Sequence, residues 1–352
     1  MAKKKKTLPK NFDELIKEKD IENLKKVFDV CELDARGGYG KQTALSFYQI
    51  PDELVHWLVD KGADLEAVDV YERTALHNHS MMRSGHINVF LALGANVGAR
   101  DKYGDTPLHF AAGSSFNVEA VKNLLAYNAD VASLNANKRT PLEHALARAN
   151  NIDLVNLVEI SALLLRPGIA ITSKMKEAII RIGENFEFHR ENFNKDFLPE
   201  TDKALNRLYE MYDVQPVKRR IMHDGFSPIK VKGTSWEEQF EALWELLVPS
   251  RGSAKTVQGE VVRIAGKVRD EIYRNGGGNW DNDFKKMLDA YLLHLSWGNV
   301  LPAAEMENAH QLIPGIRKNG YGDDLNFLCE LAAKWVAINP DPVELEKPGY
   351  KR

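Results

Sequence analysis

Four short phrases, each built around a threonine, recur along the first half of the sequence at a nearly constant spacing. The threonines are Thr43, Thr74, Thr106 and Thr140, so successive phrases lie 31, 32 and 34 residues apart. A second phrase precedes three of them by eleven or twelve residues, at 62–65, 94–97 and 129–131. Two phrases that keep the same period predict an array of stacked units, each burying its apolar face against its neighbours, and not one closed core.

One unit shows the pattern in nearly complete form. Residues 101–112 read Asp-Lys-Tyr-Gly-Asp-Thr-Pro-Leu-His-Phe-Ala-Ala, a run that resembles the ankyrin repeat. The resemblance implies a β-hairpin and two antiparallel helices in each unit. The residue types agree with this, because Thr106 can cap a first helix and Pro107 fits the first turn of one. Apolar residues at helical spacing from Val118 to Leu125 predict the second helix.

The ends of the array depart from the pattern, as capping units do. Residues 12–28 predict a capping pair of helices, residues 152–165 complete the Thr140 unit, and residues 172–193 predict a degenerate last unit. Lys41 and Glu72 occupy the position at which the repeat usually has glycine, and Gly38 reads as an inserted residue. The first two hairpins are therefore the least certain in shape.

These observations predict an all-α protein in which an ankyrin-repeat solenoid is followed by a second, α-helical domain. The predicted parts are a disordered basic end at 1–10, the repeats at 11–195, a connecting segment at 196–234, the helical domain at 235–340 and a tail at 341–352. In the second domain, Ser235 with Glu238 is typical of a helix start. Further helices are expected at 257–273, 281–297 and 323–338.

Composition and charge limit the classes of ligand and the cellular locations that are expected for this chain. A net charge of -3 argues against broad binding of nucleic acid, which normally needs a basic surface. Cys31 and Cys329 are too far apart in sequence to form a disulfide framework, which favours a reducing cytoplasm. No run of apolar residues is long enough for a membrane span. Lys3–Lys6 reads as a solvated end, with a nuclear-import signal as the alternative.

In ankyrin proteins, the hairpin tips and first helices line the concave face that usually binds a partner protein. Here Tyr71, Tyr103 and Asn137 each stand three residues before a repeat threonine, and the insertion would bring Tyr39 to the same tip. Tyrosine combines a large contact area with a hydroxyl group and is enriched in binding hot spots. The predicted partner-binding residues are Tyr39, Tyr71, Lys102, Tyr103, Asp105, Asn137 and Arg139. Alternatively, each tyrosine ring packs on the neighbouring hairpin.

His77 and His109 are expected to have a structural role, in which each forms a hydrogen bond between adjacent repeats.

The leading interpretation is recognition of a partner protein without catalysis, with no cofactor and no metal. Compact ankyrin proteins with an unrelated helical tail resemble bacterial immunity or antitoxin partners and host-directed effectors. The alternative is an enzyme whose helical domain binds a metal or a nucleotide through Glu260, Asp281 or Asp283, while the repeats recruit its substrate. Glu237, Glu238 and Glu241 have the spacing of helical pyrophosphohydrolases but lack the second acidic pair. The glycine-rich run 275–283 reads as a helix-helix turn.

Overall fold

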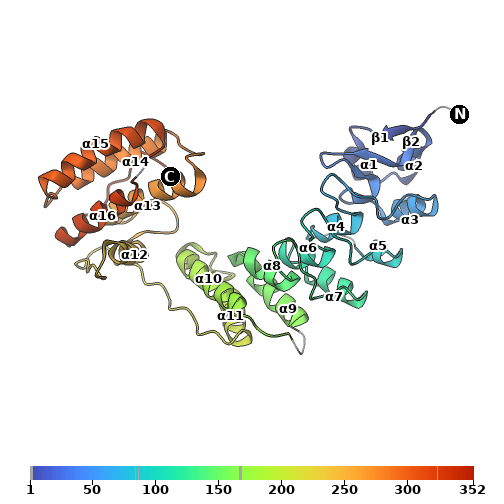
Figure 1. Cartoon of the computed structure of the whole chain (residues 1–352), viewed down its shortest axis with the longest axis horizontal. Coiled ribbons are helices and arrows are strands. Elements are labelled where there is room, and N and C mark those ends of the chain that lie inside the picture. Colours follow the sequence, from blue (N-terminus) through green and yellow to red (C-terminus); the bar gives the residue numbers. More distant parts are fainter. Residues whose placement is uncertain (1–2, 84, 86, 166–168, 323) are drawn as a thin grey trace. The chain divides into compact units, whose positions relative to one another are not determined.

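The computed structural model describes residues 3–83, 85, 87–165, 169–322 and 324–352, and it is mostly helical, as expected (Figure 1). It divides into two compact units. Unit 1 comprises residues 1–185 and 195–216, and unit 2 comprises residues 186–194 and 217–352. The division falls within one long helix, α10, and each unit is described by itself.

The N-terminal end of unit 1 contains a small sheet, where a disordered end was expected. Strand β1 (Lys5–Thr7) pairs in parallel with β2 (Cys31–Gly37), which pairs antiparallel with β3 (Gln42–Thr43). Helices α1 (Phe12–Glu18) and α2 (Ile21–Val30) lie between β1 and β2 in sequence. Leu8 is buried beside this sheet. Lysines suit an exposed edge strand, so a basic run that reads as a solvated tail can still pair through its backbone.

Three repeat units show the expected helix pairs, and Thr74, Thr106 and Thr140 are confirmed as the residues that precede the first helices. The first helices are α4 (Ala75–Ser80), α6 (Pro107–Gly113) and α8 (Pro141–Arg148). The second helices are α5 (Asn88–Ala92), α7 (Val118–Ala126) and α9 (Leu154–Leu164). Leu108 and Leu124 are completely buried between the helices, as expected for the stacking faces.

The Thr43 unit is different, because a 3-10 turn (Ala44–Ser46) takes the place of its first α-helix before α3 (Asp52–Asp60). In the other units a histidine or glutamate three residues after the threonine bonds back to it. Here that residue is Ser46, and neither its hydroxyl nor that of Thr43 has a hydrogen-bond partner among the described residues. This turn therefore lacks the capping bonds of the other first helices, and the chain leaves the helical conformation at Phe47.

The repeat array continues further than predicted. Residues 196–234 were expected to form a connecting segment, but they begin with helix α11 (Leu198–Met211), which packs on α9. The Tyr212 hydroxyl donates to Ser161 Oγ at 2.9 Å and fixes the end of this helix. The preceding helix is α10 (Ser173–His189), whose Lys176 Nζ donates to Asp213 O at 3.1 Å, just after the end of α11. A helix pattern was present in the buried residues Thr201, Ala204, Leu205, Leu208 and Tyr209.

Unit 2 is a helical bundle around α13 (Val257–Asn275), which packs against three neighbours. These are α12 (Trp236–Leu247), α14 (Asn282–Leu295) and α16 (Asn326–Ile338). Residue 323, the expected start of the last helix, is outside the described residues. Helix α15 (Ala303–Asn319), which contains Pro314, was not predicted. The expected tail packs back on the bundle, since Val257 N donates to Val343 O at 2.8 Å and Tyr350 joins the core.

Candidate functional site

Apart from Tyr39, the predicted binding residues lie on three hairpin turns that share the same pattern of hydrogen bonds. Each turn begins with Asp69, Asp101 or Asn135, whose side-chain oxygen accepts from the backbone N–H two and four residues later. In the Asp101 turn these donors are Tyr103 and Asp105, both at 2.9 Å. The other two turns repeat the same bonds at 2.8 to 3.1 Å. The backbone of each turn is therefore fixed by hydrogen bonds within the turn. The other side chains at the tip do not take part in these bonds and can face the solvent.

Successive turns are also bonded to one another. Lys102 N donates to Tyr71 O, and Ala136 N donates to Tyr103 O, both at 2.9 Å. At the first turn the accepting carbonyl belongs to Gly40, to which Val70 N donates at 3.0 Å. Gly40 is thus the residue equivalent to Tyr71 and Tyr103. The prediction that an insertion brings Tyr39 to this position is therefore wrong, and Tyr39 lies one residue earlier.

The tyrosines differ in how far they are exposed. Tyr39 is 100% exposed, Tyr103 50% and Tyr71 37%. The guanidinium of Arg73 lies 4.9 Å from the centre of the Tyr71 ring, so this ring is partly covered by a side chain of its own turn. Lys102, Asn137 and Arg139 are exposed beside the tyrosines.

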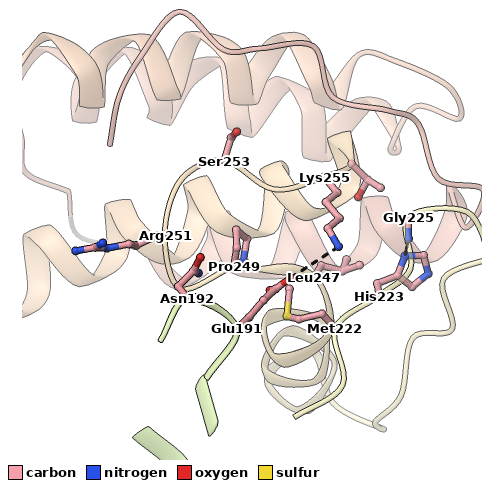
Figure 2. Close-up of a pocket in the computed structure, with 11 residues that line it drawn as sticks. Glu191, Asn192, Met222, His223, Gly225, Leu247, Pro249, Arg251, Ser253 and Lys255 are labelled. Atoms are coloured by element: carbon pink, nitrogen blue, oxygen red, sulfur yellow. Dashed lines mark hydrogen bonds and ion pairs between the residues drawn. The ribbon is translucent and has the colours of Figure 1, made fainter. Parts of the chain in front are cut away.

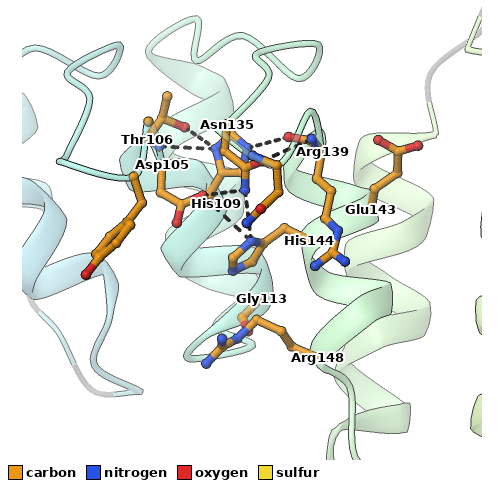
Figure 3. Close-up of polar contacts among 12 residues, drawn as sticks. Asp105, Thr106, His109, Gly113, Asn135, Arg139, Glu143, His144 and Arg148 are labelled. Carbon is orange, nitrogen blue, oxygen red and sulfur yellow. Dashed lines mark hydrogen bonds and ion pairs between the residues drawn. The ribbon is translucent and has the colours of Figure 1, made fainter.

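Asp105 is the exception among the predicted site residues, because it is buried between repeats (Figure 3). Its carboxylate accepts from Asn135 Nδ2 at 2.7 Å and lies 3.7 Å from His144 Nδ1. These contacts are internal, so we leave Asp105 out of the surface proposed below. The sequence position is next to the tip, but the side chain points into the stack.

The buried histidines join adjacent repeats. His109 Nδ1 accepts from Thr106 N at 3.1 Å, which leaves the proton on Nε2 to be donated to Arg139 O at 3.0 Å. His77 makes the equivalent bonds to Thr74 and to Asp105 O. Burial lowers the pKa of both rings and lowers the pKa of His144 to about 4. All three rings are therefore neutral connectors near pH 7, in keeping with the structural role expected for His77 and His109.

A groove lies beside the last of these turns. It has a volume of about 480 Å³ and is bounded by the turn, α8 and α10. Its lining residues are Asn137, Lys138, Arg139, Glu143, Leu146, Ala147, Lys174, Met175, Glu177, Ala178 and Arg181. Sequence reasoning named Asn137 and Arg139 and missed the rest, because the gap depends on how far α10 stands from α8.

The three carboxylates proposed for an enzyme site, Glu260, Asp281 and Asp283, all accept hydrogen bonds from other residues of the same unit. Glu260 is buried and accepts from Arg263 at 2.6 and 2.8 Å and from the Tyr350 hydroxyl at 2.7 Å. Asp281 caps α14 and pairs with Arg352 at 2.8 Å, while Asp283 accepts from Lys351 N. Within the described residues, no group of three or more histidine, cysteine or acidic side chains is arranged to hold a metal ion.

The remaining acidic residues of α12 have simpler environments. Glu238 accepts from Thr234 N at 2.8 Å and takes part in the helix start predicted from Ser235. Glu241 lies 3.8 Å from Arg269, and Glu237 is exposed. These contacts are typical of a helix surface.

Unit 2 has a small pocket of about 140 Å³ between the start of α13 and the segment before α12 (Figure 2). Lys255 Nζ lies 4.0 Å from Glu191 there. The figure shows Arg251 pointing away from the pocket, and Ser253 and His223 lying well apart. The lining therefore brings together no nucleophile with a base.

Comparison with known proteins agrees with the repeat geometry. The family described as ankyrin repeats (3 copies) matches residues 41–131 and 79–173. Residues 41–173, in the N-terminal half of this chain, are ankyrin repeats. A Rickettsia bellii (strain RML369-C) protein that carries the name of an ankyrin repeat protein is 36% identical over 76 residues, or 21% of this chain. The match covers 31% of that protein's own length, so it supports the repeat and not a shared activity.

Ankyrin repeats are protein-interaction modules, which agrees with the expected binding of a partner. In the part of the chain that the structure describes, no helix has the length and apolar character needed to cross a membrane. Cys31 and Cys329 are both buried free thiols. The cytoplasmic location inferred from them stays a prediction.

Proposed function

We propose that the ankyrin-repeat domain binds a partner protein through its hairpin tips, without catalysis. The observation that supports this most is the contrast between backbone and side chains at the tips. The amides of Tyr103 and Asp105 are bonded within their turn, while the side chains of Tyr103 and Lys102 are exposed. Tyr39 is exposed on the first turn, which lacks these side-chain bonds among the described residues. Aromatic side chains held on a rigid backbone lose little freedom on binding, which favours affinity.

The proposed surface consists of six of the seven predicted residues. They are Tyr39, Tyr71, Lys102, Tyr103, Asn137 and Arg139. An immunity, antitoxin or effector role stays a prediction, because it depends on the family resemblance alone. The enzyme alternative is not proposed, because Glu260 and Asp281 already bond to arginines of the same bundle.

The test is affinity capture of partners by the full chain, followed by comparison of two variants. In the first variant Tyr39, Tyr71 and Tyr103 are changed to alanine. The matched control is Tyr127→Ala, which removes a tyrosine 48% exposed at the end of α7, away from the turns. Truncating a hot-spot tyrosine weakens binding by about 2 kcal/mol or more, so the first variant should lose the partner. The proposal fails if the triple variant binds as the control does.

A further inference from the structure

The groove between α8 and α10 is a consequence of uneven stacking. Earlier in the array the first helices pack closely: α6 meets α8 at Gly113, where an added Cβ would lie 3.0 Å from Ala145 N and collide with the His144 ring. The α8–α10 pair instead leaves the gap of about 480 Å³. The outer helices α9 and α11 still pack together, so the array remains continuous behind the groove.

Basic side chains predominate on the walls of this groove. Four lining residues are cationic, namely Lys138, Arg139, Lys174 and Arg181, and two are acidic, Glu143 and Glu177. Arg181 donates a hydrogen bond to Leu146 O at 2.8 Å. Glu143 accepts a hydrogen bond from Thr140 N and so takes part in the N-terminal cap of α8. Among the described residues, the side chains of Lys138, Arg139 and Lys174 have no hydrogen-bond or ion-pair partner. The groove therefore has four cationic and two acidic side chains, and Lys138, Arg139 and Lys174 are the cations available to pair with a ligand.

Lys138 lies on the hairpin turn that borders this groove. Its φ is 56°, and it occupies the turn position at which the preceding repeat has Gly104, with φ 73°. A side chain in the left-handed region is strained, and glycine would adopt this turn more easily. Lys41 and Glu72 take the same turn position with φ values of 49° and 62°, so a non-glycine residue with positive φ is general in these turns. Lys138 differs from them because its side chain lines the groove.

We propose that this groove binds an acidic segment of the partner protein, with carboxylates pairing to Lys138, Arg139 and Lys174. This inference rests on the proposed function and specifies the chemistry of the partner. The positive end of α10, which begins at Ser173 in the next position to Lys174, favours an anion in the same place.

The test uses the full chain and defined probes. Binding of a fluorescein-labelled peptide of alternating glutamate and alanine is measured by fluorescence anisotropy, beside a lysine-alanine peptide and a single-stranded oligo-dT. We expect the acidic peptide to bind best and to weaken as salt rises from about 50 to about 200 mM, as exposed ion pairs do. A stronger signal from either other probe would overturn the proposal.

Charge-reversed variants locate the site. Changing Lys138, Arg139 and Lys174 to glutamate should weaken binding of the acidic peptide by about tenfold or more. Lys26→Glu, on the exposed face of α2, is the matched control and should leave binding unchanged. Lys138→Gly should weaken binding while the melting temperature holds or rises, which separates lost contact from misfolding. Equal affinity in the triple variant and the control would refute the inference.

The two proposals can fail separately. If a captured partner is lost by the tyrosine variant but kept by the charge-reversed variant, the tips bind it and the groove does not. If the charge-reversed variant alone loses the partner, the groove is supported and the tyrosine surface is wrong.

Discussion

Acid should weaken the repeat stack through the buried His144. This ring lies beside Asn135 and Asp105, and burial lowers its pKa from 6.5 to about 4 even though Asp105 favours the charged form. The folded state therefore binds fewer protons than the unfolded state between these two values. Its contribution to stability is complete above pH 6.5 and is lost as pH falls towards 4.

The size of the effect follows from the two pKa values. Lowering the pH from about 7.5 to about 5 should reduce the free energy of unfolding by about 2 kcal/mol through this residue. His77 and His109, whose pKa values are also lowered by burial, act in the same direction. The assay is hydrogen exchange of the amides in α6 and α8 at both pH values, after correction for intrinsic exchange rates.

A variant isolates His144 from the other histidines. In His144→Asn, the amide oxygen can take the place of Nδ1 facing Asn135, so the neighbour keeps a partner and the titrating group is removed. The loss of stability with acid should then be smaller by about 2 kcal/mol. An unchanged pH dependence, or a His144 pKa measured by NMR near 6.5, would refute the reasoning.

Three further substitutions test the fold. Leu108→Ala should cost about 2–5 kcal/mol in urea unfolding, because the side chain is completely buried between repeats, and a cost below about 1 kcal/mol would mean that the stacking is misplaced. Tyr212→Phe should cost about 1 kcal/mol by removing the bond to Ser161, and no change would question the placement of α11. Glu72→Gly should leave stability equal or raise it by up to about 1 kcal/mol, since φ is 62° there, whereas a clear drop in melting temperature would contradict this.

The repeat region could be predicted because each unit has its own local signals. A threonine with a histidine or glutamate three residues later caps a helix locally, so α4, α6 and α8 begin where expected. Thr43 has Ser46 at that place and begins only a 3-10 turn. Lys41 and Glu72 nevertheless adopt positive φ values of 49° and 62°, and the turns keep the shape that glycine usually provides. In the Glu72 turn this shape is held by the hydrogen bonds that Asp69 accepts from Tyr71 N and Arg73 N.

Other features depend on tertiary contacts that no local pattern reveals. The strand at Lys5–Thr7 forms only because β2 lies beside it, and its lysines conceal it in the sequence. Helix α11 was missed because Pro199 and polar residues open it, although its buried face has helical spacing. The burial of Asp105 and the groove beside α10 arise from the separation of neighbouring repeats, which sequence spacing does not report.

Hydrogen exchange of the full chain with a captured, purified partner tests the central claim most directly. The account predicts that partner binding slows exchange in the turns at 69–73, 101–105 and 135–139 and at the start of α10, with little change in α13 to α16. Protection confined to residues 217–352 would place the binding surface in unit 2 and contradict the account.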